Sequence, residues 1–187
     1  MRLFLALELA PALLGALESA IAPLRAEVPD IAWVPPQKRH LTLKFLGDVP
    51  EDRVASVVAL TDAVAHGHRP FGMQLRGIGA FPNFRRARVV WIGVEAEPRL
   101  ELLHHDLEVA GESAGFDIEG RAFRPHITLA RVRVPLAADH MRRLARAARR
   151  IDFSAEQEIA GITLFESTLA QAGAPYRRLH AAILGGC

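Results

Sequence analysis

A four-residue pattern, His-x-Thr-x, occurs twice in the sequence and constrains how the chain can fold. The first copy spans 40–43 and the second spans 126–129, so that His126 follows His40 by 86 positions. The same offset carries Leu3 onto Val89, and each of these residues begins a short apolar run. Agreement in motif, offset and surrounding pattern predicts an internal duplication.

Apolar periodicity gives the two halves the same order of elements. The first half predicts strands over 3–8, 39–46 and 71–78, with helices after Pro11 and through Val54 to Val64. The second half predicts strands over 89–94, 122–130, 158–165 and 176–184, with helices after Pro98 and over 138–150. We therefore expect an α+β fold, a bilobal pseudo-twofold duplication of a β-α-β-α-β unit. Residues 1–187 would form a single two-lobed domain, with largely antiparallel sheets lining a central cleft.

Each motif should present two polar side chains on one face of its strand. Side chains at i and i+2 share a face in extended backbone, so His40 and Thr42 project together. The alternation sends Leu41, Leu43 and Phe45 the other way, into a core. His126 and Thr128 should project in the same manner, opposite Ile127 and Leu129. Each motif is then an apolar anchor that carries an imidazole and a hydroxyl.

Two imidazoles that face one cleft suit general acid-base catalysis. A histidine pKa near ~6.5 allows one ring to be neutral and the other protonated at neutral pH. Hydrolysis of a cyclic phosphate by in-line attack needs a base that takes a proton from water and an acid that protonates the leaving ribose oxygen. The hydroxyls of Thr42 and Thr128 could donate to the non-bridging phosphate oxygens. This chemistry requires neither a metal nor another cofactor.

Composition excludes several other classes of protein. The chain has 187 residues, 50% of them hydrophobic, and its only cysteine is Cys187, which rules out an internal disulfide framework and argues for a reducing cytoplasm. The apolar N-terminal stretch 3–24 resembles a signal peptide, but Glu8, Pro11 and Glu18 interrupt it, and we expect a strand and a helix there instead. No stretch approaches the ~18 uncharged residues of a membrane span. The 23 basic residues include only two lysines, which is compatible with an anionic ligand or with a simple compositional bias.

Longer blocks of sequence surround the motifs and carry a family resemblance. They cover 2–7, 33–36, 40–47, 81–83, 124–131 and 164–167. In these blocks the chain resembles the two-histidine (2H) phosphoesterase superfamily and, within it, the bacterial and archaeal RNA 2′,3′-cyclic phosphodiesterases, once called 2′-5′ RNA ligases. The resemblance implies an enzyme that acts on RNA or oligonucleotide ends bearing a 2′,3′-cyclic phosphate.

The resemblance also implies roles for individual residues. His40 would donate a proton to the leaving 3′ oxygen, and His126 would accept one from water, which gives a 2′-phosphomonoester. The near-symmetric motifs do not by themselves say which ring is the donor. Arg131 would contact the nucleotide, although strict alternation places it on the face opposite His126. That role requires the strand to end or twist after Ala130.

Three other activities stay open at this point. The substrate could be a small cyclic nucleotide or ADP-ribose cyclic phosphate, the chain could join RNA in the reverse direction, or it could bind RNA without turnover. We expect a monomer that binds neither membrane nor metal.

Several polar residues outside the motifs are expected to have no catalytic role. The remaining histidines lack a ligand-like pattern, and we expect solvent exposure for His66, His68, His104 and His105. The basic pair before the first motif, Lys38 and Arg39, is interpreted as a solvated loop, with a contribution to RNA-backbone binding as the alternative. The arginines of 142–150 form one helical face, which is interpreted as solvated, with an RNA-backbone patch as the alternative.

Overall fold

Strands make up one continuous sheet in the computed structural model, which describes residues 1–167 and 176–185. The strands are β1 (Arg2–Glu8), β2 (Ala32–Trp33), β3 (His40–Asp48), β4 (Phe71–Phe81), β5 (Val89–Val94), β6 (His126–Arg131), β7 (Ser154–Ile159), β8 (Gly161–Glu166) and β9 (Arg177–Ile183). The α-helices are α1 (Pro11–Glu27), α2 (Val54–His66), α3 (Pro98–Ser113) and α4 (Ala138–Arg150). The short 3-10 helices are η1 (Pro36–Lys38), η2 (Glu51–Arg53) and η3 (Phe84–Arg86).

The order of strands in the sheet has an internal symmetry. It runs β7-β4-β5-β6-β3-β1-β8-β9, with β2 added beside β6, and each pair of neighbours is antiparallel. The motif strands β3 and β6 meet at the centre through a single pair, Leu41 with Ile127. Outward from this join, β1 corresponds to β5 and β8 to β4. The α+β class and the antiparallel sheet expected from the sequence are confirmed.

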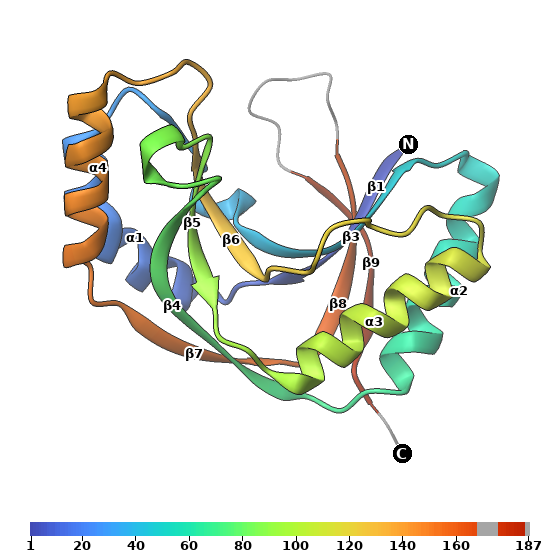
Figure 1. The fold of residues 1–187 in the computed structure, drawn as a ribbon. Helices are drawn as coiled ribbons and strands as arrows, with labels where there is room; N and C mark the ends of the chain where they lie inside the picture. The colour runs from blue at the N-terminus through green and yellow to red at the C-terminus, as the bar shows by residue number, and fades with distance from the viewer. Residues whose placement is uncertain (168–175, 186–187) are drawn as a thin grey trace.

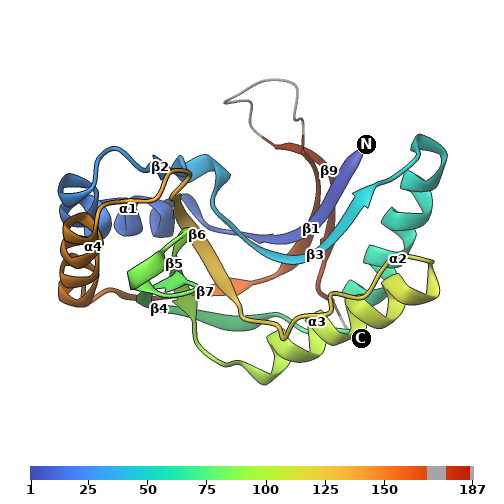
Figure 2. The same ribbon diagram turned by 45° about the horizontal axis from the view of Figure 1, so that its top comes forward.

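Each lobe of the molecule combines elements from both halves of the sequence. Helices α1 and α4 pack together beside β4, β5 and β6, whereas α2 and α3 pack together beside β3, β8 and β9. Figures 1 and 2 show these two helix pairs on opposite flanks of the molecule, with the strands between them. The chain crosses from one lobe to the other several times, so neither repeat can form its lobe alone.

Apolar faces of the helices fix this arrangement. Helix α1 buries Leu13, Leu17, Ile21 and Leu24, which recur at helical spacing and pack onto the sheet. The N-terminal stretch that resembles a signal peptide therefore forms β1 and α1. Within the described residues, no helix combines the length and the apolar character needed to cross a membrane.

The single strand expected over 158–165 is wrong, because two strands occupy this region. Strand β7 pairs with β4 and β8 pairs with β1, so Ala160 between them marks the passage from one lobe to the other. The burial pattern changes at the same place: β7 alternates, whereas β8 is buried over four consecutive residues. Strand β6 also starts at His126 rather than at 122, and β2 was not expected.

Matching bulges interrupt the alternation in both motif strands. Between Thr42 and Lys44, β3 has one residue more than β1, and between Thr128 and Ala130, β6 has one residue more than β5. The extra residues are Leu43 and Leu129, which are 86 positions apart. A bulge shifts the phase of a strand by one residue, so the residues after it change face.

The bulge in β3 corrects the expected orientation of Phe45. Instead of pointing into a core, the Phe45 side chain is 64% exposed and lines a cavity. The bulge in β6 has the equivalent effect on Arg131, which lines the same cavity although strict alternation would turn it away. Leu43 and Lys44 are consecutively buried, as are Leu129 and Ala130.

Candidate active site

The four polar residues of the two motifs lie in the wall of one cavity. His40, Thr42, His126 and Thr128 all line a hollow of about 240 Å³ at the join of β3 and β6. Antiparallel pairing of Leu41 with Ile127 sets His40 opposite Thr128 and Thr42 opposite His126. The two imidazoles thus occupy one diagonal of the site and the two hydroxyls the other. We call this hollow the central cavity.

Other side chains complete the wall of the central cavity, and of these the sequence had indicated only Arg131. Lys38 and Tyr176 lie near His40, and Phe45 and Arg131 stand at equivalent positions of the two repeats. The remaining lining residues are Arg2, Leu3, Phe4, Val34 and Ser167. The 86-residue offset makes Phe45 equivalent to Arg131, and this equivalence could have predicted from the sequence that Phe45 lines the cavity.

The same hydrogen bond orients both motif histidines. His40 Nδ1 lies 3.0 Å from the carbonyl oxygen of Lys38, and His126 Nδ1 lies 2.7 Å from the carbonyl oxygen of Arg124. A carbonyl oxygen only accepts, so each Nδ1 carries a hydrogen and donates it. In the neutral ring Nε2 then keeps its lone pair, and each histidine can accept a proton there or, once protonated, donate one.

Aromatic rings enclose His40 and change its acidity. The His40 ring centroid lies 4.9 Å from that of Phe4 and 5.2 Å from that of Tyr176. The pKa of His40 is lowered to about 4, mainly because burial disfavours the charged ring, and the positive charge of Arg131 contributes to the same shift. The hydrogen bond to Lys38 and the charge of Glu8 oppose that shift without reversing it. In the protein alone, His40 is therefore neutral at pH 7.

His126 has a different aromatic neighbourhood. Its ring meets Phe81 edge to face at a centroid distance of 4.9 Å, and Trp91 lies 6.3 Å away. Trp91 can pack here because Gly79 has no side chain, and a Cβ at Gly79 would collide with the indole ring. The indole supports His126 from the sheet, in keeping with the packing role of an aromatic residue within an apolar strand.

Arg39 is part of the framework of the site rather than of a solvated loop. Its side chain is 4% exposed, its Nε donates to the carbonyl oxygen of Val34 at 3.1 Å, and its Nη2 lies 2.6 Å from Glu18 Oε2. The loop interpretation was therefore wrong for Arg39. This ion pair connects α1 to the residue that precedes His40, and so holds the start of β3 in place.

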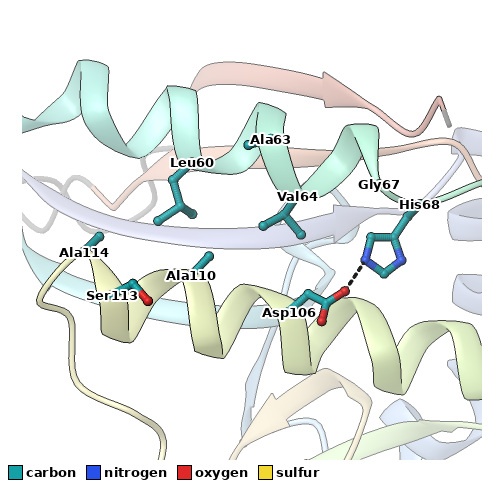
Figure 3. A pocket seen from close by; sticks show the side chains of 9 residues that line it. All are labelled: Leu60, Ala63, Val64, Gly67, His68, Asp106, Ala110, Ser113 and Ala114. Atoms are coloured by element: carbon teal, nitrogen blue, oxygen red, sulfur yellow. Dashed lines mark hydrogen bonds and ion pairs between the residues drawn. The ribbon is translucent and has the colours of Figure 1, made fainter. Parts of the chain in front are cut away.

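A second hollow, an open groove of about 520 Å³, lies elsewhere, between α2 and α3 (Figure 3). Its walls are mainly small and apolar side chains, and it contains none of the motif residues. At one end His68 Nε2 lies 2.9 Å from Asp106 Oδ2, and His68 is buried, so the expected solvent exposure of this histidine was wrong. His104 is also covered, since it stacks on Phe123 at 3.8 Å.

The potential metal ligands do not gather into a site. Among residues 1–167 and 176–185, no group of three or more histidine, cysteine, aspartate or glutamate side chains could hold a metal ion. The polar side chains of the central cavity are two imidazoles, the hydroxyls of Thr42, Thr128, Ser167 and Tyr176, and the cations Lys38, Arg2 and Arg131. Such a set suits a phosphate group.

A family model described as LigT-like phosphoesterase matches the chain twice, over residues 8–91 and 92–176. Each match contains one His-x-Thr-x motif and one bulged strand. The chain belongs to the LigT-like phosphoesterase family. Two successive matches also agree with the internal duplication, and the family expected from the sequence is confirmed.

Relatives of this LigT-like phosphoesterase are found in archaea and bacteria. An RNA 2′,3′-cyclic phosphodiesterase of Methanothermobacter thermautotrophicus is 31% identical over 175 residues, which cover 94% of each chain. A crystal structure from Thermus thermophilus is similar with a TM-score of 0.81 and 33% identity, and the match covers 100% of this chain and 99% of that one. The crystal structure of E. coli LigT complexed with 3′-AMP has a TM-score of 0.71 and 28% identity, with 98% and 97% coverage.

Proposed function

We propose that this chain hydrolyses the 2′,3′-cyclic phosphate at an RNA end to a 2′-phosphomonoester, without a metal ion. The observation that carries the proposal is the convergence of His40 and His126 on one cavity, each with Nδ1 bound to a backbone carbonyl and Nε2 available. The name RNA 2′,3′-cyclic phosphodiesterase, borne by the archaeal relative, supports the same substrate class.

The proposed step divides the proton transfers between the two rings. His126 Nε2 accepts a proton from water as the water oxygen attacks phosphorus, and the bond between phosphorus and O3′ breaks. His40 Nε2 gives its proton to O3′, so that the phosphate stays on O2′. The hydroxyls of Thr42 and Thr128 donate to the non-bridging oxygens, where negative charge increases in the transition state. The guanidinium of Arg131 donates hydrogen bonds to the same phosphate group.

Proton donation by His40 depends on the substrate itself. In the protein alone the pKa of His40 is about 4, because the ring is buried and faces Arg131. The negative charge of a bound phosphodiester favours the imidazolium and raises this pKa. Substrate binding would thereby favour the protonated form of His40, which is the form that acts as the acid. Without a bound anion the ring stays uncharged.

One chain provides both histidines, so we propose that a monomer is active and that residues 1–187 act as one two-lobed domain. The lone cysteine, Cys187, fits a reducing compartment such as the cytoplasm.

The test uses an oligoribonucleotide that ends in a 2′,3′-cyclic phosphate, incubated with the protein in excess chelator. The expected product carries a 2′-phosphate, identified by its mobility against 2′- and 3′-phosphate standards. A 3′-phosphate product or a strict requirement for metal would contradict the proposed chemistry. An absence of turnover, with binding retained, would favour a non-catalytic RNA-binding protein.

A further inference from the structure

Four exposed arginines lie where the wall formed by β5 and β6 reaches the surface. Arg85 and Arg86 belong to η3, Arg88 precedes β5, and Arg133 follows the end of β6 by two residues. We call this group the basic ledge. None of the four forms an ion pair with any residue in the described part of the chain. The sequence around them explains this, because 63–94 and 120–138 contain no aspartate or glutamate.

Backbone hydrogen bonds hold the basic ledge together. Asn83 Oδ1 accepts from the backbone N–H groups of Arg85 at 2.9 Å and Arg86 at 3.2 Å. The Arg88 carbonyl oxygen accepts from the N–H of Val132 at 2.9 Å, which joins the two segments of the ledge. In Figures 1 and 2 the green turn between β4 and β5 accordingly lies beside the end of β6. These bonds fix the backbone positions from which the arginine side chains of the ledge extend.

The basic ledge is continuous with the central cavity. Arg131, which lines the cavity, pairs in register with Val89, directly after Arg88. Arg133 is exposed two positions farther along the chain, beyond the end of β6. A polyanion whose end is bound in the cavity can therefore leave it past Arg131 toward the segments that carry the ledge arginines.

Two arginines of β9 are neutralised instead. Arg177 Nε lies 2.7 Å from Glu166 Oε2, and Arg178 Nη2 lies 2.5 Å from Glu8 Oε2. Arg2 and Lys38 in the cavity wall also form no ion pair among the described residues, so the positive charge of the wall and the ledge is free, whereas that of Arg177 and Arg178 is neutralised. A negatively charged chain that leaves the cavity would meet free guanidinium groups at the ledge and paired ones at β9, which favours exit along the ledge.

We propose that the basic ledge binds the phosphates of the nucleotides immediately 5′ of the cyclic phosphate, which makes single-stranded oligoribonucleotides the preferred substrates over mononucleotides. This inference rests on the proposed function. Each internucleotide linkage carries one negative charge, and guanidinium groups bind phosphate through paired hydrogen bonds. A mononucleotide 2′,3′-cyclic phosphate has no such linkage and would gain nothing from the ledge.

The test compares kcat/KM for adenosine 2′,3′-cyclic phosphate with kcat/KM for oligoadenylates of two to six nucleotides ending in the same group. For the native protein we expect kcat/KM to rise with length and to fall steeply with salt. For the variant Arg88→Ala/Arg133→Ala, kcat/KM on the longer substrates should fall about tenfold. The slope of log(kcat/KM) against the logarithm of salt concentration should become shallower by about one. The kcat/KM of this variant for the mononucleotide should not change. A matched control is Arg146→Ala/Arg149→Ala on α4, which removes two charges from the outer flank.

Substrates with methylphosphonate linkages give a second measurement that needs no variant. They keep the bases and the cyclic phosphate but have no backbone charge, so their kcat/KM should drop to the mononucleotide value. Equal kcat/KM for mononucleotide and hexanucleotide in the native protein would overturn the ledge proposal and leave the proposed function intact. Unchanged oligonucleotide kinetics in the Arg88→Ala/Arg133→Ala variant would also overturn it. A lack of turnover on every substrate would instead contradict the proposed function itself.

Discussion

Phe45 and Arg131 occupy the same position of the two repeats, and both line the central cavity because each motif strand has one extra residue after its threonine. Without the bulges at Leu43 and Leu129, both side chains would turn toward the apolar side of the sheet. The duplication thus provides two equivalent positions facing the cavity. One position carries a ring and the other a cation, so the repeats differ where they would meet a nucleotide.

Arg131→Ala should lower kcat/KM on a 2′,3′-cyclic phosphate substrate by about 10- to 100-fold, the usual contribution of a hydrogen bond to a charged group. Arg131→Lys should recover part of this loss, because lysine restores the charge but not the paired hydrogen bonds. Steady-state kinetics would check both variants. Kinetics of Arg131→Ala equal to those of the native protein would exclude a contact with the phosphate.

Phe45→Ala should raise KM with little effect on kcat, since an exposed ring in the cavity can stack on the terminal base but cannot reach the bonds that change. A stacked base contributes about 1–3 kcal/mol, which corresponds to a KM increase of at least fivefold. Phe45→Tyr should behave like the native protein. The side chain is 64% exposed, so its removal should leave the melting temperature nearly unchanged. A large drop in melting temperature would show a structural role instead.

His40→Ala and His126→Ala should each reduce turnover by about 10²- to 10⁴-fold, the range for loss of a general acid or base. Both rings face the cavity rather than the apolar core, so the circular dichroism spectrum should not change. His105→Ala is the matched control, because His105 is exposed on α3. Full activity in either motif variant would disprove the two-histidine mechanism.

The pKa of His40 can be followed by NMR titration of its imidazole signals. A midpoint near 4 is expected in the protein alone, and added inorganic phosphate should move it upward. Arg131→Ala should raise the midpoint by removing a nearby positive charge, and Glu8→Gln should lower it by removing a negative one. A midpoint at or above 6.5 without phosphate would refute the burial argument.

The lowered pKa of His40 should also make the free energy of unfolding depend on pH. Between pH 6.5 and about 4 an unfolded chain binds a proton at His40 that the folded chain does not, so unfolding takes up a proton there. The free energy of unfolding should therefore fall as pH falls through this window. His40→Gln, which cannot titrate, should make the decline shallower in urea denaturation at several pH values. An identical decline in the variant would show that His40 does not contribute to it.

Substitution of Lys44 would test how the buried ion pair behind the first motif stabilises the fold. Lys44 is buried, its Nζ lies 2.9 Å from Glu108 Oε2 and 2.8 Å from the carbonyl oxygen of Asp117, and Gly111 leaves room for its side chain. Lys44→Met should lower the free energy of unfolding by about 3–5 kcal/mol, because Glu108 would be left buried without its partner. Lys44→Met/Glu108→Leu should recover much of that loss. Urea denaturation would measure both, and a loss below about 1 kcal/mol in the single variant would contradict this account.

The sequence by itself predicted the duplication, the order of most elements and the two motif histidines with their threonines. These features depend on local pattern: apolar periodicity defines each strand or helix, and the 86-residue offset is visible without coordinates. The sequence also showed that Arg131 could reach the site only if the strand departed from strict alternation after Ala130.

Long-range pairing decided the rest. The bulges at Leu43 and Leu129 exist only relative to the neighbouring strands β1 and β5, so strand alternation placed Phe45 on the wrong face, and only its equivalence with Arg131 pointed to the cavity. The division of 158–165 into β7 and β8 likewise follows from pairing with strands in different lobes. Burial of Arg39 needs Glu18 from α1, and the low pKa of His40 needs rings from β1 and from the residue before β9. The sequence determined which residue types are present and how they are spaced. The face on which each side chain lies, its burial and the charges around it were decided only by the packing of segments that are distant in the chain.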